Sequence, residues 1–151
     1  MSDWLSDELY MQITASIPLV CVDLVPVRKN RGGFQIGIIE RATGKEAGKM
    51  ALLGGRVCHN ELLSNASKRH LYDGFGVKDF RFYPWNSIER PFFVQQYIHD
   101  TTSEAPLGYD PSKHAVALTY LIENKENPQP RVEASAYRWI EAADVPSRAA
   151  Y

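Results

Sequence analysis

Three side chains near the middle of the chain, Arg69, His70 and Asp73, have types and spacing that could do chemistry together. Residues three or four apart lie on one side of a helix, and His70 and Asp73 would project about 60° apart on it. A neutral imidazole and a carboxylate so placed, next to an exposed loop carbonyl, could hold a divalent cation. The same spacing also fits a half-buried helix histidine beside a surface acid, so both interpretations stay open.

A paired glycine and a helix are the elements that must position these side chains. Gly54 and Gly55 end a short apolar run, and we expect a tight turn there that exposes backbone carbonyls and amides to a ligand. A helix should follow, with Asn60 as its N-cap and Glu61 at the positive end of its dipole. Gly74 is the expected stop.

The spacing around this helix resembles the Nudix box, G-x5-E-x7-R-E-U-x-E-E-x-G-U, in which U is a bulky aliphatic residue. The residues that match the pattern are Gly55, Glu61, Arg69, Leu71, Gly76 and Val77. Where the pattern has three more glutamates, this chain has His70, Asp73 and Gly74. Those acids are magnesium ligands in the family, so the resemblance implies Mg²⁺ or Mn²⁺ as the cofactor, held by an altered box.

The likeness covers nearly the whole chain and is greatest to the GDP-mannose mannosyl hydrolase branch of the family. The stretches that match that branch in order are Ile17-Pro18-Leu19-Val20 with Asp23, Gly33-Phe34, Gly54-Gly55-Arg56-Val57, Tyr137-Arg138-Trp139 and Ser147-Arg148-Ala149-Ala150-Tyr151. The branch keeps one box glutamate as a metal ligand, and that position is Gly74 here. Its metal-binding glutamine and its base histidine correspond to Glu133 and Ala134.

The resemblance implies a Nudix-like α/β/α sandwich that hydrolyses a nucleoside diphosphate linked to another moiety, with a sugar nucleotide such as GDP-mannose favoured. The expected metal ligands are the Gly55 carbonyl, Asp73, Glu133 and His70. The expected substrate contacts are Arg56, His114, Asp23 and Gly54, because a guanidinium and an imidazole can donate to phosphate. The expected catalytic residues are His70, Asp23 and Arg56, and a carboxylate and a histidine compete for the role of base.

A second class of function is a Nudix-fold protein that binds a nucleotide or sugar ligand without turnover. Gly74 removes a carboxylate and Ala134 removes the expected base. Each loss could slow a general-base reaction by roughly 10²- to 10⁴-fold. The sequence leaves the hydrolase and the binding protein as alternatives.

Composition limits the setting. A chain of 151 residues fits one domain, 1–151. Its formal charge of -1 argues against a broad nucleic-acid or anionic-membrane surface. Two cysteines, Cys21 and Cys58, are too few for a disulfide scaffold or a structural zinc site, which fits a reduced cytoplasmic setting. Residues 1–16 lack the features of a signal peptide or a membrane span. The resemblance implies a homodimer.

The remaining pattern predicts an α+β domain with a mixed sheet. Residues 1–16 favour a short amphipathic helix capped by Ser6 or Ser2. Strands are expected over 17–28, 34–40, 92–99, 115–122 and 137–140, with a hairpin turn at 30–33, a loop over 100–113 and a helix or turn from Glu141. Asp23 interrupts the first strand, so it should pair with Arg28 or Arg56, or line the ligand cleft.

Overall fold

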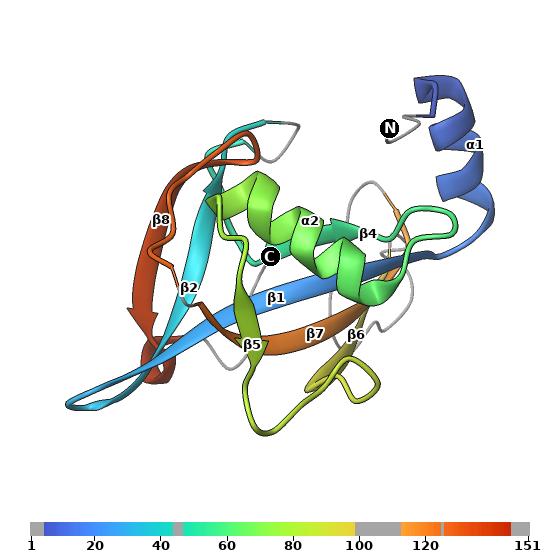
Figure 1. The fold of residues 1–151 in the computed structure, drawn as a ribbon. Coiled ribbons are helices and arrows are strands. Elements are labelled where there is room, and N and C mark those ends of the chain that lie inside the picture. The colour runs from blue at the N-terminus through green and yellow to red at the C-terminus, as the bar shows by residue number, and fades with distance from the viewer. Residues whose placement is uncertain (1–4, 44–46, 99–112, 125, 146–151) are drawn as a thin grey trace.

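The computed structural model describes residues 5–43, 47–98, 113–124 and 126–145 (Figure 1). In chain order the elements are α1 (Asp7–Ser16), β1 (Leu19–Asn30), β2 (Gly33–Arg41), β3 (Met50–Ala51), β4 (Leu53–Arg56), α2 (Leu63–Phe75), β5 (Phe80–Phe82), β6 (Phe93–Tyr97), β7 (Ala115–Asn124), β8 (Ala134–Glu141) and the 3₁₀ turn η1 (Ala142–Asp144).

The centre of the fold is the parallel pair β1 and β7, and each of these long strands changes neighbour along its outer edge. Residues 21–24 of β1 pair with β4, whereas residues 27–30 pair with β2. Likewise β7 pairs with β6 over 115–119 and with β5 over 122–124. All pairings besides β1 with β7 are antiparallel, so the predicted α+β class with a mixed sheet is confirmed.

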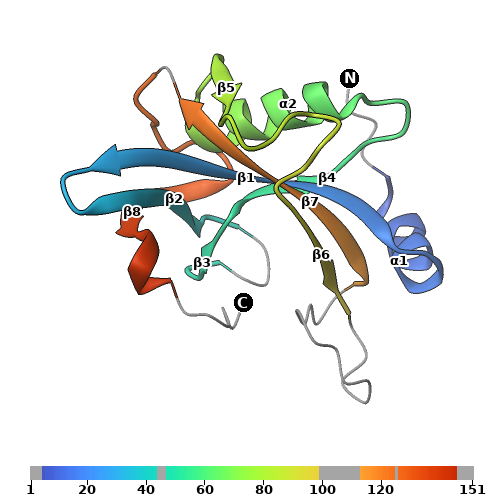
Figure 2. The same ribbon diagram turned by 90° about the horizontal axis from the view of Figure 1, so that it is seen from below.

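Helix α2 covers one face of the central strands, and η1 lies on the other side (Figure 2). The buried residues of α2 come in adjacent pairs that recur every four positions, as expected for the face of a helix that packs on a sheet: Ala66, Ser67, His70, Leu71, Gly74 and Phe75. Val22 and Leu24 of β1 belong to the cluster beneath this stripe. Cys21 packs instead with Ala115 and Ala117, because side chains alternate between faces along a strand.

The bounds of α2 differ from the prediction at both ends. The N-cap is Leu62, whose side chain cannot cap, and the predicted cap Asn60 lies earlier in the loop with a φ of 58°. The helix passes through Gly74 and ends at Phe75, because Gly76 takes the left-handed conformation with a φ of 68°. A Cβ at Gly74 would overlap the Leu53 side chain, so that glycine serves packing rather than termination.

Other sequence predictions are confirmed with small shifts. Helix α1 begins after Ser6, whose hydroxyl oxygen accepts the Leu9 amide at 3.3 Å. The β1–β2 hairpin and the strands at 93–97 and 115–124 form as expected, while β8 begins earlier than predicted, at Ala134. Most of the predicted loop over 100–113, and the closing stretch 147–151, lie outside the described residues. No helix in the described ranges has the length and apolarity needed to cross a membrane.

Candidate functional site

Gly54 and Gly55 lie inside strand β4, opposite Asp23 and Val22 of β1, so the predicted tight turn at this point is wrong. Close approach is what requires glycine at both positions. A Cβ at Gly54 would overlap the Val22 carbonyl oxygen and lie 2.6 Å from Asp23 Oδ1. A Cβ at Gly55 would lie 2.7 Å from His70 Cε1.

Because the two glycines carry no side chains, β4 presents only backbone to both faces of the sheet at these positions. Within the described residues β4 pairs with β1 alone, so one side of it is open. Successive residues of a strand face opposite sides of a sheet, and Asp23 and His70 therefore approach β4 from opposite faces. Only backbone stands between these two predicted site residues.

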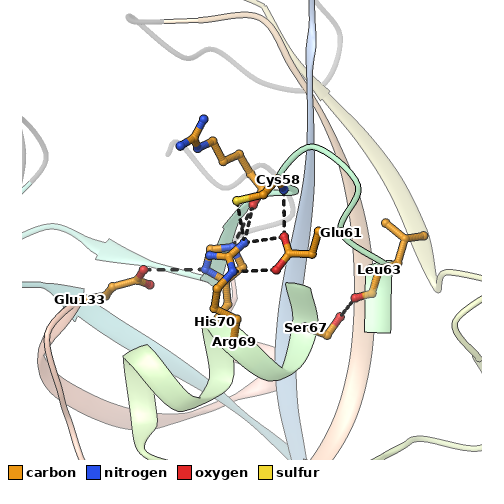
Figure 3. Close-up of polar contacts among 8 residues, drawn as sticks. Cys58, Glu61, Leu63, Ser67, Arg69, His70 and Glu133 are labelled. Atoms are coloured by element: carbon orange, nitrogen blue, oxygen red, sulfur yellow. Dashed lines mark hydrogen bonds and ion pairs between the residues drawn. The ribbon is translucent and has the colours of Figure 1, made fainter. Parts of the chain in front are cut away.

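The loop between β4 and α2 is fastened by Glu61 and Arg69 (Figure 3). Arg69 Nε and Nη2 donate to the two carboxylate oxygens, each at 2.8 Å. The Cys58 amide donates to the same carboxylate at 2.8 Å. The hydrogen bonds from Arg69, more than that amide, lower the pKa of Glu61 to about 2. Glu61 was predicted to complement the helix dipole, but it instead closes the loop against the helix.

His70 is the neighbour of Arg69, and its ring is only 4% exposed. Nε2 lies 3.1 Å from the Arg56 carbonyl oxygen, which also accepts from Arg69 Nη2 at 3.0 Å. A carbonyl can only accept, so Nε2 carries the hydrogen. Nδ1 is then left with a lone pair, and among the described groups it has no hydrogen-bond partner.

Glu133 points toward this lone pair (Figure 3). Its Oε1 lies 3.7 Å from His70 Nδ1, which is beyond hydrogen-bond reach. Two acceptors that face each other in a half-buried place attract each other only through a cation between them, either a proton or a metal ion. The Glu133 side chain is 37% exposed, so solutes can reach the gap from its side.

The loop before β8 holds Glu133 in place. The amides of Gln129 and Arg131 donate to the carbonyls of Phe75 and Gly74, at 2.8 and 3.0 Å, and so cap the C-terminus of α2. The Glu133 carbonyl then accepts the amide of Ala42 at 3.0 Å. The sequence analysis gave this loop no role. Its signal is the order Pro-Gln-Pro-Arg over 128–131, in which only the two non-proline residues can donate.

Asp23 and Arg56 share the face opposite α2, because Arg56 lies opposite Cys21 and Asp23 is two residues further along β1. Burial raises the pKa of Asp23 to about 6, and the cationic forms of His70 and Lys113 would act against this rise. A carboxylate that titrates near 6 suits a general base at neutral pH. Of the two partners predicted for Asp23, Arg28 donates to Gln35 at 2.8 Å instead. Lining a cleft on this face stays a prediction.

Asp73 and His114 are not gathered with the pair of His70 and Glu133. No group of three or more His, Cys, Asp or Glu residues able to hold a metal ion is present in the described part of the chain. Asp73 lies near enough to Arg69 to favour the guanidinium charge. His114 Nε2 contacts Gln96 Nε2 at 2.7 Å at the mouth of β7. Their roles as metal ligand and substrate contact stay predictions.

Comparison with known proteins identifies a family and similar structures. The model of a family described as "Domain of unknown function (DUF4916)" matches residues 1–150. The crystal structure of a possible asymmetric diadenosine tetraphosphate (Ap4A) hydrolase from Jonesia denitrificans is 32% identical, covers 83% of this chain and 77% of its own, and has a TM-score of 0.66. None of the curated proteins compared with the chain matches it.

Two more distant structures are similar in fold. An Ap4A hydrolase binary complex from C. elegans is 15% identical, with 83% and 82% of the two chains covered and a TM-score of 0.62. A MutT Nudix hydrolase from Burkholderia pseudomallei is 21% identical, with 87% and 88% covered and a TM-score of 0.58. The predicted Nudix-like α/β/α sandwich is thereby confirmed. The GDP-mannose branch was the finer part of the prediction, and these structures do not single it out.

Proposed function

The chain belongs to the DUF4916 family and has the fold of the Nudix hydrolases, and from this premise we propose that it hydrolyses a nucleoside diphosphate linked to another moiety with the help of a divalent cation. The observation that carries the proposal is the buried, unpartnered Nδ1 of His70, which faces a carboxylate beside the glycines of β4. The identity of 32% to the Jonesia denitrificans protein supports it.

Two donors face each other across 3.7 Å where a cation could lie, although no third His, Cys, Asp or Glu of the described residues is gathered with them. His70 Nδ1 and Glu133 Oε1 would hold it from the α2 side, and the Gly55 carbonyl and Asp73 are the further ligands that we propose. When bound, such an ion neutralises the diphosphate and stabilises the leaving group. The pair Glu61 and Arg69 keeps the loop after β4 closed, which fixes the Arg56 carbonyl and through it the direction of the imidazole.

Past the open edge of β4, residues of its opposite face would supply binding and proton transfer to the same substrate. The Arg56 guanidinium can donate two hydrogen bonds to a phosphate, and His114 is proposed as a second donor. Asp23 lies over Gly54 and has a raised pKa, so it is the favoured base that takes a proton from water. Attack at the sugar carbon would give a nucleoside diphosphate and a free sugar. Attack at phosphorus would give a nucleoside monophosphate and a sugar phosphate.

Two substrate types share the chemistry that this site would recognise. Sequence resemblance favours a sugar nucleotide such as GDP-mannose, whereas the name of the Jonesia denitrificans protein points to dinucleoside tetraphosphates. Both carry a nucleoside diphosphate group with another moiety attached. We place the sugar nucleotide first.

The alternative is a protein that binds such a ligand without turnover. The observation that favours it is the packing at Gly74, where the family pattern has a glutamate. The Leu53 side chain fills the space that a Cβ would need, so no acid fits there without movement of the strand below. The cytoplasmic setting and the homodimer stay predictions, and light scattering of the purified protein would test the latter.

A panel of GDP-mannose, other sugar nucleotides, diadenosine tetraphosphate and nucleoside triphosphates, each with Mg²⁺ or Mn²⁺, tests the proposal by ³¹P NMR of the products. We expect metal-dependent turnover of at least one diphosphate-linked substrate, and loss of it in Asp23→Asn but not in Glu123→Gln, a matched change on the exposed face of β7. Saturable binding without turnover would support the alternative. Neither binding nor turnover would contradict both.

A further inference from the structure

We infer that the pair of His70 and Glu133 selects a cation that accepts an imidazole nitrogen, of the Co²⁺, Ni²⁺ or Zn²⁺ class, over Mg²⁺. The inference rests on the proposed function and deepens it, because it concerns the identity of the ion at the same site. It is drawn from the way the ring of His70 is held.

The ring is held as a metal-binding histidine is held. Such a histidine donates its second ring N–H to a backbone carbonyl or a carboxylate, which fixes its tautomer and its direction. Here Nε2 donates to the Arg56 carbonyl at 3.1 Å, and Gly55 leaves room for the ring at Cε1. Nδ1 therefore carries the lone pair, and it points toward Glu133.

The chemistry of the two donors sets the preference. Mg²⁺ is a hard ion that favours oxygen ligands and keeps much of its water. Imidazole suits zinc, copper, iron and nickel better. A site whose most buried donor is a nitrogen, with one carboxylate oxygen beside it, gives up part of its affinity for Mg²⁺ while it keeps its affinity for the softer ions.

His70 Nδ1 and Glu133 Oε1 are the two donors that the structure brings together at this place. His70 lies among the buried residues of α2, and in the described ranges no third His, Cys, Asp or Glu completes a metal group with it. The imidazole nitrogen is thus one of two gathered donors. The proposed Gly55 carbonyl and Asp73, together with phosphate oxygens and water, would supply the remaining positions.

Selectivity is best measured as a ratio, because most nitrogen and oxygen sites bind Co²⁺ more tightly than Mg²⁺. Isothermal titration of the full chain with CoCl₂ and with MgCl₂ gives the selectivity as the ratio Kd(Mg²⁺)/Kd(Co²⁺), and the visible absorption of bound Co²⁺ changes with the ligands around it. We expect His70→Glu, which restores the carboxylate of the Nudix pattern, to lower this ratio by about tenfold or more. His70→Gln, which also lacks the imidazole, should lower it too.

His59 offers a matched control, because it is an exposed histidine in the loop before the same helix. His59→Glu should leave both the ratio and the Co²⁺ spectrum unchanged. Circular dichroism and thermal unfolding check the fold of each variant, and His70→Gln keeps the test open if a buried glutamate prevents folding.

Three results would overturn the inference in distinguishable ways. If both ions bind and the ratio is the same in His70→Glu and His70→Gln, the selectivity is wrong while the proposed function stands. If the Co²⁺ spectrum is lost in His59→Glu, the site lies in the loop and not at His70. If neither ion binds the wild-type chain, the metal-dependent function fails together with the inference.

Discussion

Arg69 and His70 are neighbours on α2, and each faces a carboxylate from another segment, but the two pairs are opposites. Arg69 and Glu61 are closed by two hydrogen bonds of 2.8 Å, with a third from the Cys58 amide. His70 and Glu133 stay 3.7 Å apart, and the facing nitrogen has no partner among the described groups. The first pair completes the fold. The second leaves a gap that a ligand can fill.

The energies of the two pairs explain why both persist. A bidentate guanidinium pair in a partly buried place satisfies its donors and acceptors, and so holds the loop before α2. A buried polar atom without a partner costs about 1–3 kcal/mol of stability. Proteins keep such a cost mainly where a site needs the free group. The contrast therefore separates a residue of the scaffold from a residue of the candidate site.

The largest expected effect on stability comes from opening the closed pair. Glu61→Gln would leave the Arg69 guanidinium short of its charged partner and should lower the free energy of unfolding by about 2–3 kcal/mol. Urea unfolding measures the change. The control is Glu123→Gln, since Arg81 and Glu123 form an exposed pair with 67% and 41% of the side chains accessible. That variant should lose less than about 1 kcal/mol. Equal losses would contradict the structural role of the closed pair.

The closed pair also predicts a pH signature. Because the pKa of Glu61 is lowered from 4.5 to about 2, the unfolded chain binds more protons between these values. The stability from this carboxylate is full above pH 4.5 and is lost as the pH falls toward 2. Wild-type unfolding free energies should therefore fall more steeply over this window than those of Glu61→Gln. Parallel curves would rule out the pairing as the cause.

Asp23 lies on the other side of β4, and its pKa is shifted in the direction opposite to that of Glu61, from 3.8 up to about 6. The folded chain binds more protons between these values, so stability falls as the pH rises from 3.8 to 6. Asp23→Asn should remove this fall and raise the free energy of unfolding at pH 7 by at most about 3 kcal/mol, less the cost of burying the amide. Thermal unfolding between pH 4 and 7 measures it. A loss of stability at neutral pH would mean that the carboxylate is paired rather than strained.

The smallest expected effect on stability belongs to the open pair. Glu133→Gln should change the free energy of unfolding by less than about 1 kcal/mol, because no close hydrogen bond to His70 is lost. It should instead weaken the binding of Mn²⁺ by about tenfold or more, and Asp73→Asn should weaken it as well if Asp73 is a ligand. Calorimetric titration measures the affinities. A large loss of stability with unchanged affinity would make the open pair a second structural pair.

The sequence predicted the fold class and the position of the box because both depend on local spacing. The separation of Glu61 from Arg69 and the nearly continuous apolar run of β1 are visible in the sequence alone. Gly54 and Gly55 were misplaced in a turn because glycine serves turns and close approaches equally well. Gly74 was predicted to end α2, but Gly76 ends it with a left-handed φ of 68°, and Gly74 makes room for the Leu53 side chain.

The contact between His70 and Glu133 depends on long-range structure that no local pattern contains. It forms because the backbone amides of residues 129 and 131 cap the end of α2, and this brings Glu133 next to the turn of α2 that carries His70. A resemblance to the Nudix pattern placed both residues at the metal site. The gap between them, and the tautomer that leaves Nδ1 free, became visible only with the hydrogen bond to the Arg56 carbonyl.

Crystals soaked in CoCl₂ and measured at the cobalt absorption edge test the open pair most directly. We predict an anomalous peak between His70 and Glu133, within bonding distance of Nδ1 and Oε1. Density without such a peak, in which the imidazole and the carboxylate have closed on each other through a hydrogen bond, would contradict a cation site at this pair.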